Sequence, residues 1–368
     1  MCAKQASLIW VVFSHPDHYH RYQGDSAAFR QRIAHEISLC QDKLTLAFAQ
    51  DPGFILHFMD ATALVTRLQQ QKDHPDLVLF VMESRNFEEG IYSPPLNEFE
   101  LKAYLKSLSI PYSGCDGLSL FADYDKSLQY ALALSCGIAT PAQFFIAPSC
   151  DPTLIAWSLY PAFIKPCLHG DSIGIRPSSV VHHQGELLHE VARLRALFPN
   201  EPLLLQEFLE GGEYTIGIMG NWDAPDCQTL PIIQIGYDKS EAAVPVLTHD
   251  AKNNPDSVEY MQDYYHIATL PPALEQQIRH DTLAIYKRMK GRGYARADWR
   301  LDKNGTAKFL EINALPDIMD EASSIVKMYR HKTGKNQGDF FKEIIRYGLM
   351  PENNRPQSER RATSLTPL

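Results

Sequence analysis

The side chains best suited to chemistry lie in one short stretch, residues 294–316, which reads YARADWRLDKNGTAKFLEINALP. Its first half alternates apolar and charged residues, the period of a strand with one buried face. A second strand is predicted over residues 307–313. The Asn304-Gly305 pair between them is typical of a two-residue type I′ hairpin turn, which would fix the register of the hairpin.

In that register two carboxylates face each other, because Asp298 lies opposite Glu311. Arg296 lies opposite Asn313, and all four side chains share one face. Like charges at opposed positions destabilise a sheet unless a cation lies between them. Asp, Glu and Asn oxygens are hard ligands suited to Mg²⁺, whose shell is completed by water and phosphate. Taken alone, the pattern fits equally a solvated polar face on which Arg296 and Arg300 neutralise the acids.

The composition is that of an ordinary soluble protein, with 45% apolar and 21% charged residues in a chain of 368, long enough for two or three domains. A net charge of −9 disfavours nucleic-acid binding, so a phosphate site would have to be built locally. The apolar run 8–13 is too short for a signal peptide or a membrane span, which predicts a cytoplasmic protein with no membrane partner. Seven cysteines without a CxxC pair favour reduced thiols.

The N-terminal third is predicted to form an α/β domain. Strands near 8–13, 54–59 and 76–81 alternate with helices, the order of a parallel sheet with crossovers. The loop 14–20 between the first strand and helix, SHPDHYH, contains three histidines and an aspartate. Its spacing matches no familiar metal site, so a solvated loop is favoured over a ligand set.

Two further segments carry groups that can contact phosphate. Lys126 opens a helix, and Lys165 ends a strand over residues 161–166. The loop that follows, CLHGDSIGI at 167–175, offers glycines, the Ser172 hydroxyl and backbone N–H groups. Glycine-containing loops of this kind are more often ordinary turns.

The remaining pattern leads back to the hairpin. Strands are predicted at 203–209 and 213–219, and the polar segment 237–265 is long enough for a functional loop. An apolar helical stripe from Leu274 to Met289 is followed by Gly291, which we expect to end the helix.

In this order, these pieces resemble the D-alanine–D-alanine ligase branch of the ATP-grasp family, over roughly residues 77–324. The resemblance implies an α/β ATP-grasp fold of three domains, a parallel-sheet domain followed by two α+β domains that clamp ATP. The corresponding boundaries are 1–125 for the N-terminal substrate domain, 126–213 for the central lid domain, 214–350 for the C-terminal catalytic domain and 351–368 for a disordered tail.

The resemblance also implies roles for single residues. The nucleotide would be bound by phosphate-contacting Lys126, Lys165, Ser172 and Lys252, by the adenine linker Glu207, Phe208 and Leu209, and by Glu213 at the ribose. Gln206 stands where the family often has a glutamate. Two Mg²⁺ ions, with Mn²⁺ as a substitute, would be held by Asp298, Glu311 and Asn313. The catalytic residues would be Arg296, Lys252 and Ser172.

The family's reaction explains this set. A carboxylate attacks the γ-phosphorus of ATP, and an amine then attacks the resulting acyl phosphate through an oxyanion that Arg296 can stabilise. The enzyme would be an ADP-forming acid–amino-acid ligase that needs no covalent nucleophile. The family also implies a homodimer.

The substrate-binding motifs depart from the family pattern. Residues 14–20 replace its Gly-Gly-x-Ser-x-Glu segment, and Asp317 replaces the glycine of its Asn-Thr-x-Pro-Gly motif. Asn253 and Asp171 replace a tyrosine–serine contact. The residues that remain to recognise substrates are Glu83, Glu88, His18, Ser323 and Ser324.

Conserved ATP chemistry with altered substrate motifs leads to one leading hypothesis and two alternatives. The leading hypothesis is a ligase for a specialised pair, a small carboxylate or vinylogous acid plus an amino acid, as in mycosporine-like or dipeptide natural-product biosynthesis. The first alternative is a divergent D-alanine–D-alanine ligase of cell-wall synthesis. The second is a non-catalytic nucleotide-binding regulator, against which the complete set of catalytic charges argues.

Overall fold

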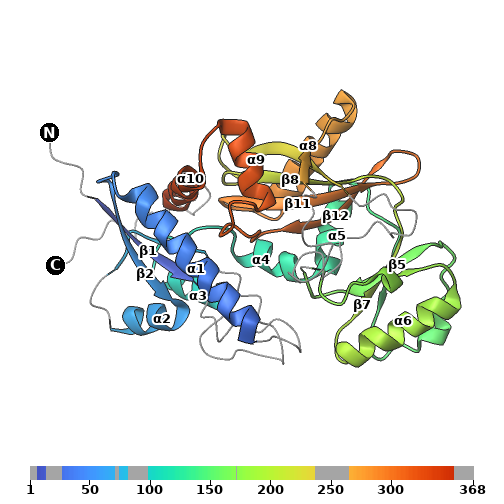
Figure 1. Cartoon of the computed structure of the whole chain (residues 1–368). Helices are drawn as coiled ribbons and strands as arrows, with labels where there is room; N and C mark the ends of the chain where they lie inside the picture. The colour runs from blue at the N-terminus through green and yellow to red at the C-terminus, as the bar shows by residue number, and fades with distance from the viewer. Residues whose placement is uncertain are drawn as a thin grey trace.

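The computed structural model describes residues 6–13, 27–70, 74–81, 98–170, 172–236 and 265–351. Three sheets follow one another along an elongated molecule (Figure 1). None of the helices in these ranges is both long and apolar enough to cross a membrane. The tail expected to be disordered lies almost wholly outside the described residues.

The N-terminal sheet is parallel, as predicted, with strand order β2-β1-β3. Central strand β1 is covered on both faces: Val11 packs towards α1 and α10, and Trp10 towards α2 and α3. A strand covered on both sides must be continuously apolar, which explains the run at its centre. The elements are β1 (Ser7–Phe13), α1 (Ala27–Phe48), β2 (Phe54–Asp60), α2 (Ala61–Gln69), β3 (Leu77–Phe80), α3 (Glu98–Ser107) and, from the far end of the chain, α10 (Gln337–Leu349).

The central sheet is antiparallel, with order β4-β7-β5-β6, and helix α6 packs along one face (Figure 1). The sequence predicted its strands β5 and β7, the latter two residues too long, but not its edge strands or α6. The elements are β4 (Gln143–Ile146), β5 (Ala162–Pro166), β6 (Val180–Val181), α6 (Gln184–Leu197), β7 (Leu203–Glu207) and two short 3-10 helices, Pro152–Leu154 and Pro177–Ser179.

The C-terminal sheet is antiparallel, with order β10-β9-β8-β11-β12. On one face Ala297 and Trp299 pack among residues of α4, α5 and α8, while α9 contacts β8 and β9. The elements are α4 (Gly117–Tyr124), α5 (Lys126–Ser135), β8 (Glu213–Met219), β9 (Gln228–Ile235), β10 (Tyr265–Ile267), α8 (Pro272–Arg288), β11 (Tyr294–Leu301), β12 (Ala307–Asn313) and α9 (Ser324–Thr333).

The β11–β12 hairpin has the predicted register at its open end but not the predicted turn. Arg296 pairs with Asn313, and Asp298 pairs with Glu311. Beyond Asp298 the register shifts by one residue, so that Leu301 pairs with Ala307. The two-residue type I′ turn was wrong, because Gly305 has φ 79° whereas Asn304 has no positive φ. The turn is longer than predicted and shifts the register by one residue, and the bulge shifts it back before Asp298 and Glu311.

Helix α8 ends slightly differently from the prediction. Lys290, not Gly291, takes the left-handed conformation, with φ 59°. Gly291 is needed for space, since a Cβ there would lie 2.0 Å from the ring of Tyr286.

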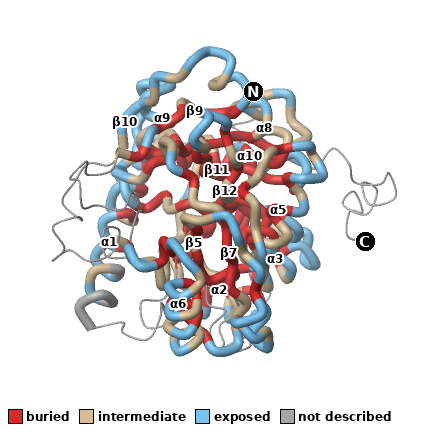
Figure 2. Tube along the Cα trace, turned by 90° about the vertical axis from the view of Figure 1, so that its right-hand side faces the viewer, coloured by how far each residue is buried: buried red, intermediate tan, exposed pale blue. Residues whose placement is uncertain are grey.

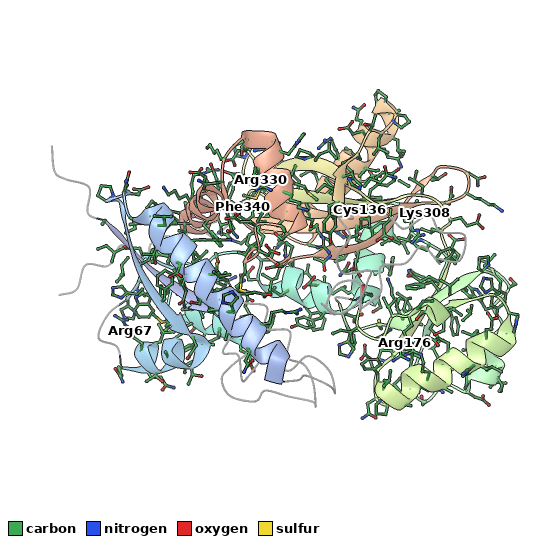
Figure 3. All side chains as sticks on the ribbon, viewed as in Figure 1. Arg67, Cys136, Arg176, Lys308, Arg330 and Phe340 are labelled. Atoms are coloured by element: carbon green, nitrogen blue, oxygen red, sulfur yellow. The ribbon has the colours of Figure 1, made fainter. Side chains whose placement is uncertain are left out.

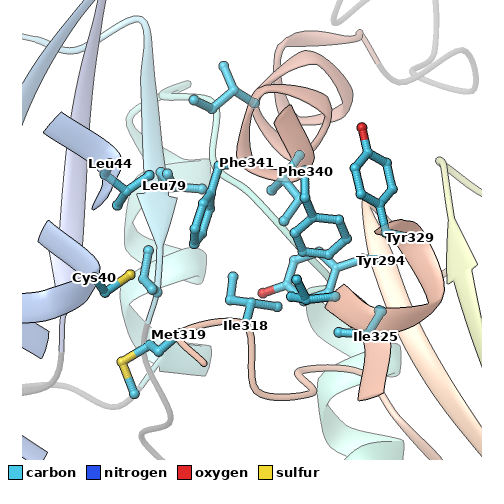
Figure 4. Close-up of a cluster of buried hydrophobic side chains, with 14 of the residues drawn as sticks. Cys40, Leu44, Leu79, Tyr294, Ile318, Met319, Ile325, Tyr329, Phe340 and Phe341 are labelled. Atoms are coloured by element: carbon cyan, nitrogen blue, oxygen red, sulfur yellow. The ribbon is translucent and has the colours of Figure 1, made fainter. Parts of the chain in front are cut away.

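The N-terminal and C-terminal sheets share one apolar core (Figure 4). Cys40, Leu44 and Leu79 come from the N-terminal side, and Tyr294, Ile325 and Tyr329 from the C-terminal side. Phe340 and Phe341 of α10, with Ile318 and Met319 of the loop after β12, fill the space between them. In Figure 2 the buried trace runs through β11 and β12 of the C-terminal sheet. The loop that follows the hairpin is thus held by packing on both sides.

Six cysteines lie in the described ranges, and all six are free thiols. Burial raises the pKa of Cys40 and of Cys115 to about 12, so both stay protonated near neutral pH.

Candidate functional site

A pocket lies between the central and C-terminal sheets and holds about 1050 Å³ of space between protein atoms, part of it open to solvent. Figure 3 labels Arg176 beside the central sheet and Lys308 on the β11–β12 hairpin. The pocket lies between these two parts of the molecule. The predicted site residues that line the pocket are Lys126, Lys165, Ser172, Glu207, Phe208, Leu209, Glu213, Arg296, Asp298, Glu311 and Ser324.

Other predicted site residues lie elsewhere. Asn313 is buried directly behind the pocket wall, hydrogen-bonded to Asp298. Ser323 is the N-cap of α9, and its hydroxyl makes no cap hydrogen bond. Four candidates lie outside the described residues, namely His18, Glu83, Glu88 and Lys252.

Asp298 is the centre of a buried polar cluster. It is 8% exposed, and both its oxygens accept from Arg296, at 3.2 Å from Nε and 3.0 Å from Nη2. Asn313 Nδ2 donates to the same carboxylate at 3.1 Å. Burial by itself lowers the pKa of Arg296, but neighbouring Asp298 holds that pKa above its ordinary range. The alternative of a solvated polar face is therefore wrong, because this face of β11 is the buried floor of a pocket.

The second carboxylate has a different cation beside it. Lys126 Nζ lies 3.6 Å from Glu311 Oε2, and the same ammonium donates to the His169 carbonyl in the loop that follows β5. Of the two arginines that the sequence offered as neutralising cations, Arg296 pairs with Asp298 and Arg300 pairs with Glu213. Lys126 lies beside Glu311, whose charge also acts on Arg296 and Lys165.

The donor chemistry at this point fits a hard divalent cation. Two carboxylates lie opposite each other in the strand register, and the Asn313 amide, with its nitrogen turned to Asp298, retains an oxygen as a ligand. No group of three or more His, Cys, Asp or Glu residues that could hold a metal occurs in the described part of the chain. Two carboxylates and one amide leave the remaining positions to water and phosphate, as Mg²⁺ prefers.

The loop 167–175 is fixed at both ends. Glu201 accepts from the Leu168 N–H at 2.6 Å and pairs with His169 at 2.8 Å. At the other end Arg193 donates to the Gly174 carbonyl at 2.7 Å. Between these anchors Ser172 has φ 57°, a left-handed conformation unusual for a non-glycine residue.

Lys165 reaches the pocket from the end of β5 and is 8% exposed. Burial lowers its pKa from the ordinary value of 10.5, and nearby Lys126 lowers it further, while Glu311 and Glu213 oppose the shift. Lys126 from α5 and Lys165 from β5 thus bring two buried ammonium groups to the pocket, an arrangement that favours an anion there.

Arg300 is a pocket residue whose role the sequence did not reveal. It is 6% exposed, donates to Glu213 Oε2 at 3.0 Å, and lies 4.9 Å above the Phe208 ring. Arg300 and Glu213 are directly paired across β11 and β8. The only usable signal was the alternation that puts Arg300 on the same face as Asp298, and its partner strand could not be read from the hairpin alone.

Comparison with known proteins gives this geometry a family. Residues 146–346 match the family model described as D-ala D-ala ligase C-terminus, more than half of the chain. The chain belongs to the D-Ala–D-Ala ligase family. This family membership, within the ATP-grasp fold, agrees with the resemblance read from the sequence.

Curated members of the D-Ala–D-Ala ligase family are similar to this chain over most of its length. The D-alanine--D-alanine ligase of Dechloromonas aromatica is 28% identical over 84% of this chain and 92% of its own length. That of Aquifex aeolicus is 27% identical over 84% of this chain and 94% of its own.

Solved structures share the fold. The ATP complex of the Bacillus anthracis D-alanine--D-alanine ligase superposes with a TM-score of 0.65 at 21% identity, covering 94% of this chain and 97% of its own. The VanG D-Ala:D-Ser ligase of Enterococcus faecalis gives 0.67 at 18% identity, covering 94% and 100%.

As a member of this family the protein is an ATP-dependent, ADP-forming ligase that makes a C–N bond. The regulator alternative is thereby set aside. ATP and a divalent metal ion belong to this chemistry.

One departure from the family motif has a structural account. Asp317 Oδ1 accepts the Met319 N–H at 2.8 Å, a local turn closed by the side chain. Ile318 and Met319 are then buried in the core shared with the N-terminal sheet. The aspartate thus shapes the loop that follows Asn313.

Proposed function

We propose that this ligase joins two molecules of D-alanine, the activity named for its curated relatives. The comparisons favour this over the leading hypothesis from the sequence, a specialised natural-product substrate pair. The single observation that carries the proposal is the convergence in one pocket of buried Lys165, the Arg296–Asp298 pair and Glu311.

In this proposal the phosphates of ATP lie between Lys165 of the central sheet and Lys126 of α5, on the side of the C-terminal sheet. The Lys126 and Lys165 ammonium groups and the Ser172 hydroxyl hold them, and Glu213 holds the ribose beside the linker 207–209. Asp298, Glu311 and Asn313 would hold two Mg²⁺ ions, for which Mn²⁺ can substitute. Bound there, Mg²⁺ supplies positive charge that offsets charge on the transferred phosphoryl group.

Two steps then form the product. A carboxylate oxygen of the first D-alanine attacks the γ-phosphorus, the bond to the β-γ bridging oxygen breaks, and ADP leaves. The amine of the second D-alanine attacks the acyl phosphate carbon, loses a proton, and inorganic phosphate departs with the C–O bond electrons. Arg296, oriented by Asp298, stabilises the oxyanion between attack and departure.

The test is ADP release from ATP and Mg²⁺ with D-alanine as sole amino acid, with products read by mass spectrometry. The dipeptide is the expected product. We expect Glu311→Gln to lose turnover by about a hundredfold while its circular dichroism and unfolding midpoint stay those of wild type. Unchanged product formation by Glu311→Gln would contradict the metal assignment.

A second candidate is a ligase for another substrate pair, a carboxylate or vinylogous acid with a different amino acid. The observation that favours it is Asp317, which occupies the family's glycine position and accepts from the Met319 N–H. ADP release by pooled amino acids but not by D-alanine would support it, and the product mass would give the substrates. The same preparations, sized by light scattering, test the proposed homodimer.

A further inference from the structure

Strand β12 carries two proposed metal ligands yet lies at the edge of its sheet, and β11 is its only neighbouring strand among the described residues. The outer backbone groups of an edge strand need partners when they are buried. Here the Phe309 N–H donates to the Ala139 carbonyl at 2.9 Å, and the other partners described below are side chains of α5. At the bulge the Tyr130 hydroxyl donates to the Leu310 carbonyl at 2.7 Å.

One turn of α5 extends this contact. Gln129 Oε1 accepts the Ile312 N–H at 2.7 Å, and Gln129 Nε2 donates to the Ile312 carbonyl at 3.1 Å. The carboxamide therefore replaces the peptide group of an absent neighbouring strand. Gln129 and Tyr130 are each only 1% exposed.

Helix α5 also contacts Glu311, the residue between Leu310 and Ile312. Lys126, three and four positions before Gln129 and Tyr130 and thus on the same helical face, pairs with Glu311. Three side chains of α5 therefore contact three consecutive residues of β12: Leu310, Glu311 and Ile312. The contacts begin where the bulge restores the register that sets Glu311 opposite Asp298.

Tyr130 also connects β12 to the opposite wall of the pocket. Gln206 Nε2, from β7, donates to the Tyr130 hydroxyl at 2.6 Å. The hydroxyl has one proton, which goes to the Leu310 carbonyl, so Gln206 must donate with its nitrogen. Burial raises the pKa of Tyr130 above its ordinary value, so the hydroxyl keeps its proton.

We propose that Gln129 and Tyr130 are positioning residues that hold β12 so that Glu311 and Asn313 present their oxygens to the metal. The role rests on the proposed function, since it requires those two residues to be metal ligands. Neither positioning residue touches a reacting atom: each acts through the backbone of β12.

The direct test is Mn²⁺ binding in the presence of the ATP analogue AMP-PNP, followed by the electron paramagnetic resonance signal of free Mn²⁺. Tyr130→Phe removes one oxygen atom and leaves the ring packed on Phe309. Gln129→Met removes both contacts to Ile312 at nearly constant volume. We expect Mn²⁺ to bind each variant about tenfold more weakly than wild type, the usual effect of losing a group that orients a metal ligand.

Tyr160→Phe is the matched control. Tyr160 also makes a part-buried hydrogen bond to a glutamine, Gln184, at 3.0 Å, but it does not line the pocket. We expect its Mn²⁺ affinity to stay within about twofold of wild type, even where its unfolding midpoint falls as far as that of Tyr130→Phe.

The outcomes separate the two proposals. Wild-type affinity in both Tyr130→Phe and Gln129→Met would overturn the positioning role and leave the proposed function standing. Failure of wild-type protein to bind Mn²⁺ with AMP-PNP would overturn both. Hydrogen exchange at the Ile312 amide, faster in Gln129→Met but not in Tyr160→Phe, supports the proposed contact independently of metal.

Discussion

At the scale of the residue, Arg300 is a buried cation that would serve the proposed nucleotide site through another side chain, Glu213. It fixes Glu213 by a charged hydrogen bond and covers Phe208. We expect Arg300→Met to raise KM for ATP about tenfold, the value of one such bond, with kcat little changed. Steady-state kinetics at varied ATP measures this, and Arg346→Met, which removes an exposed pair with Asp226, is the control. A fall in kcat at saturating ATP would instead place Arg300 in the chemistry.

The lowered pKa of Lys165 gives a prediction about pH. Only the protonated ammonium attracts phosphate, and burial shifts its loss of charge to a pH below the ordinary 10.5. ATP affinity should therefore weaken as pH rises from neutral towards 10.5, earlier than for an exposed lysine. Lys165→Arg keeps its charge throughout this range and should lose the dependence. Isothermal titration with AMP-PNP between neutral pH and pH 10.5 measures the affinity of both proteins. An equal decline in wild type and Lys165→Arg would mean that a group other than Lys165 causes the pH dependence.

The same group affects the stability of the ligand-free protein, and the sign is fixed. A lysine whose pKa is lowered on folding binds fewer protons in the native state than in the unfolded state. Its contribution to the free energy of unfolding therefore increases with pH between the lowered pKa and 10.5, as the buried charge is relieved.

Residue types and spacing singled out Asp298, Glu311 and Lys165, and all three line one pocket. The same patterns also fitted a solvated face and an ordinary turn, so the roles assigned to these residues came from the resemblance to a family. Arg300 and Gln129 were not found. Each acts through a partner that is distant in sequence, Glu213 for Arg300 and the backbone of Ile312 for Gln129. The local pattern of apolar and polar residues does not predict such long-range pairs.

At the scale of the element, the hairpin shows a correct register reached for an incomplete reason. The Asn304-Gly305 pair indicated a turn in the right place, but local pattern could not distinguish a two-residue loop from a longer one. The bulge between Asp298 and the turn corrects the register by one residue. Its partners on α5 lie about 180 positions away along the chain, which explains why the sequence did not reveal it.

This geometry predicts that the turn and the site are independent. Gly305 has φ 79° with open space around it, so Gly305→Ala should cost about 1 kcal/mol of unfolding free energy from backbone strain alone. Gly305→Asn should cost less, because asparagine tolerates this conformation. Urea unfolding measures the cost. Both variants should retain wild-type ADP release, since the bulge sets the register at Glu311, and reduced turnover at wild-type stability would refute that independence.

At the scale of the whole molecule, the pocket lies between two sheets whose cores meet at Leu204 of β7, which is buried in the core of the C-terminal sheet. The order of motifs was sufficient to predict the ATP-grasp fold, because each motif is tied to a strand end or a loop. The boundaries at 125, 213 and 350 remain a prediction. Substrate identity was harder to read, since the segments expected to recognise it, around 14–20 and 83–90, lie outside the described residues, and the first of them departs from the family pattern.

A ligand that contacts both walls should stabilise both sheets together. AMP-PNP with Mg²⁺ at a hundred times its dissociation constant should add about 2.7 kcal/mol to the free energy of unfolding. In hydrogen exchange, protection should increase in β5 and β7 on one wall and in β11 and β12 on the other. Glu311→Gln is the informative comparison, because it should retain the protection that AMP-PNP alone confers on β5 while losing the part that requires Mg²⁺. Protection confined to the central sheet in wild-type protein would mean that the nucleotide binds one wall only, and the two sheets would then have to be brought together by the amino-acid substrates.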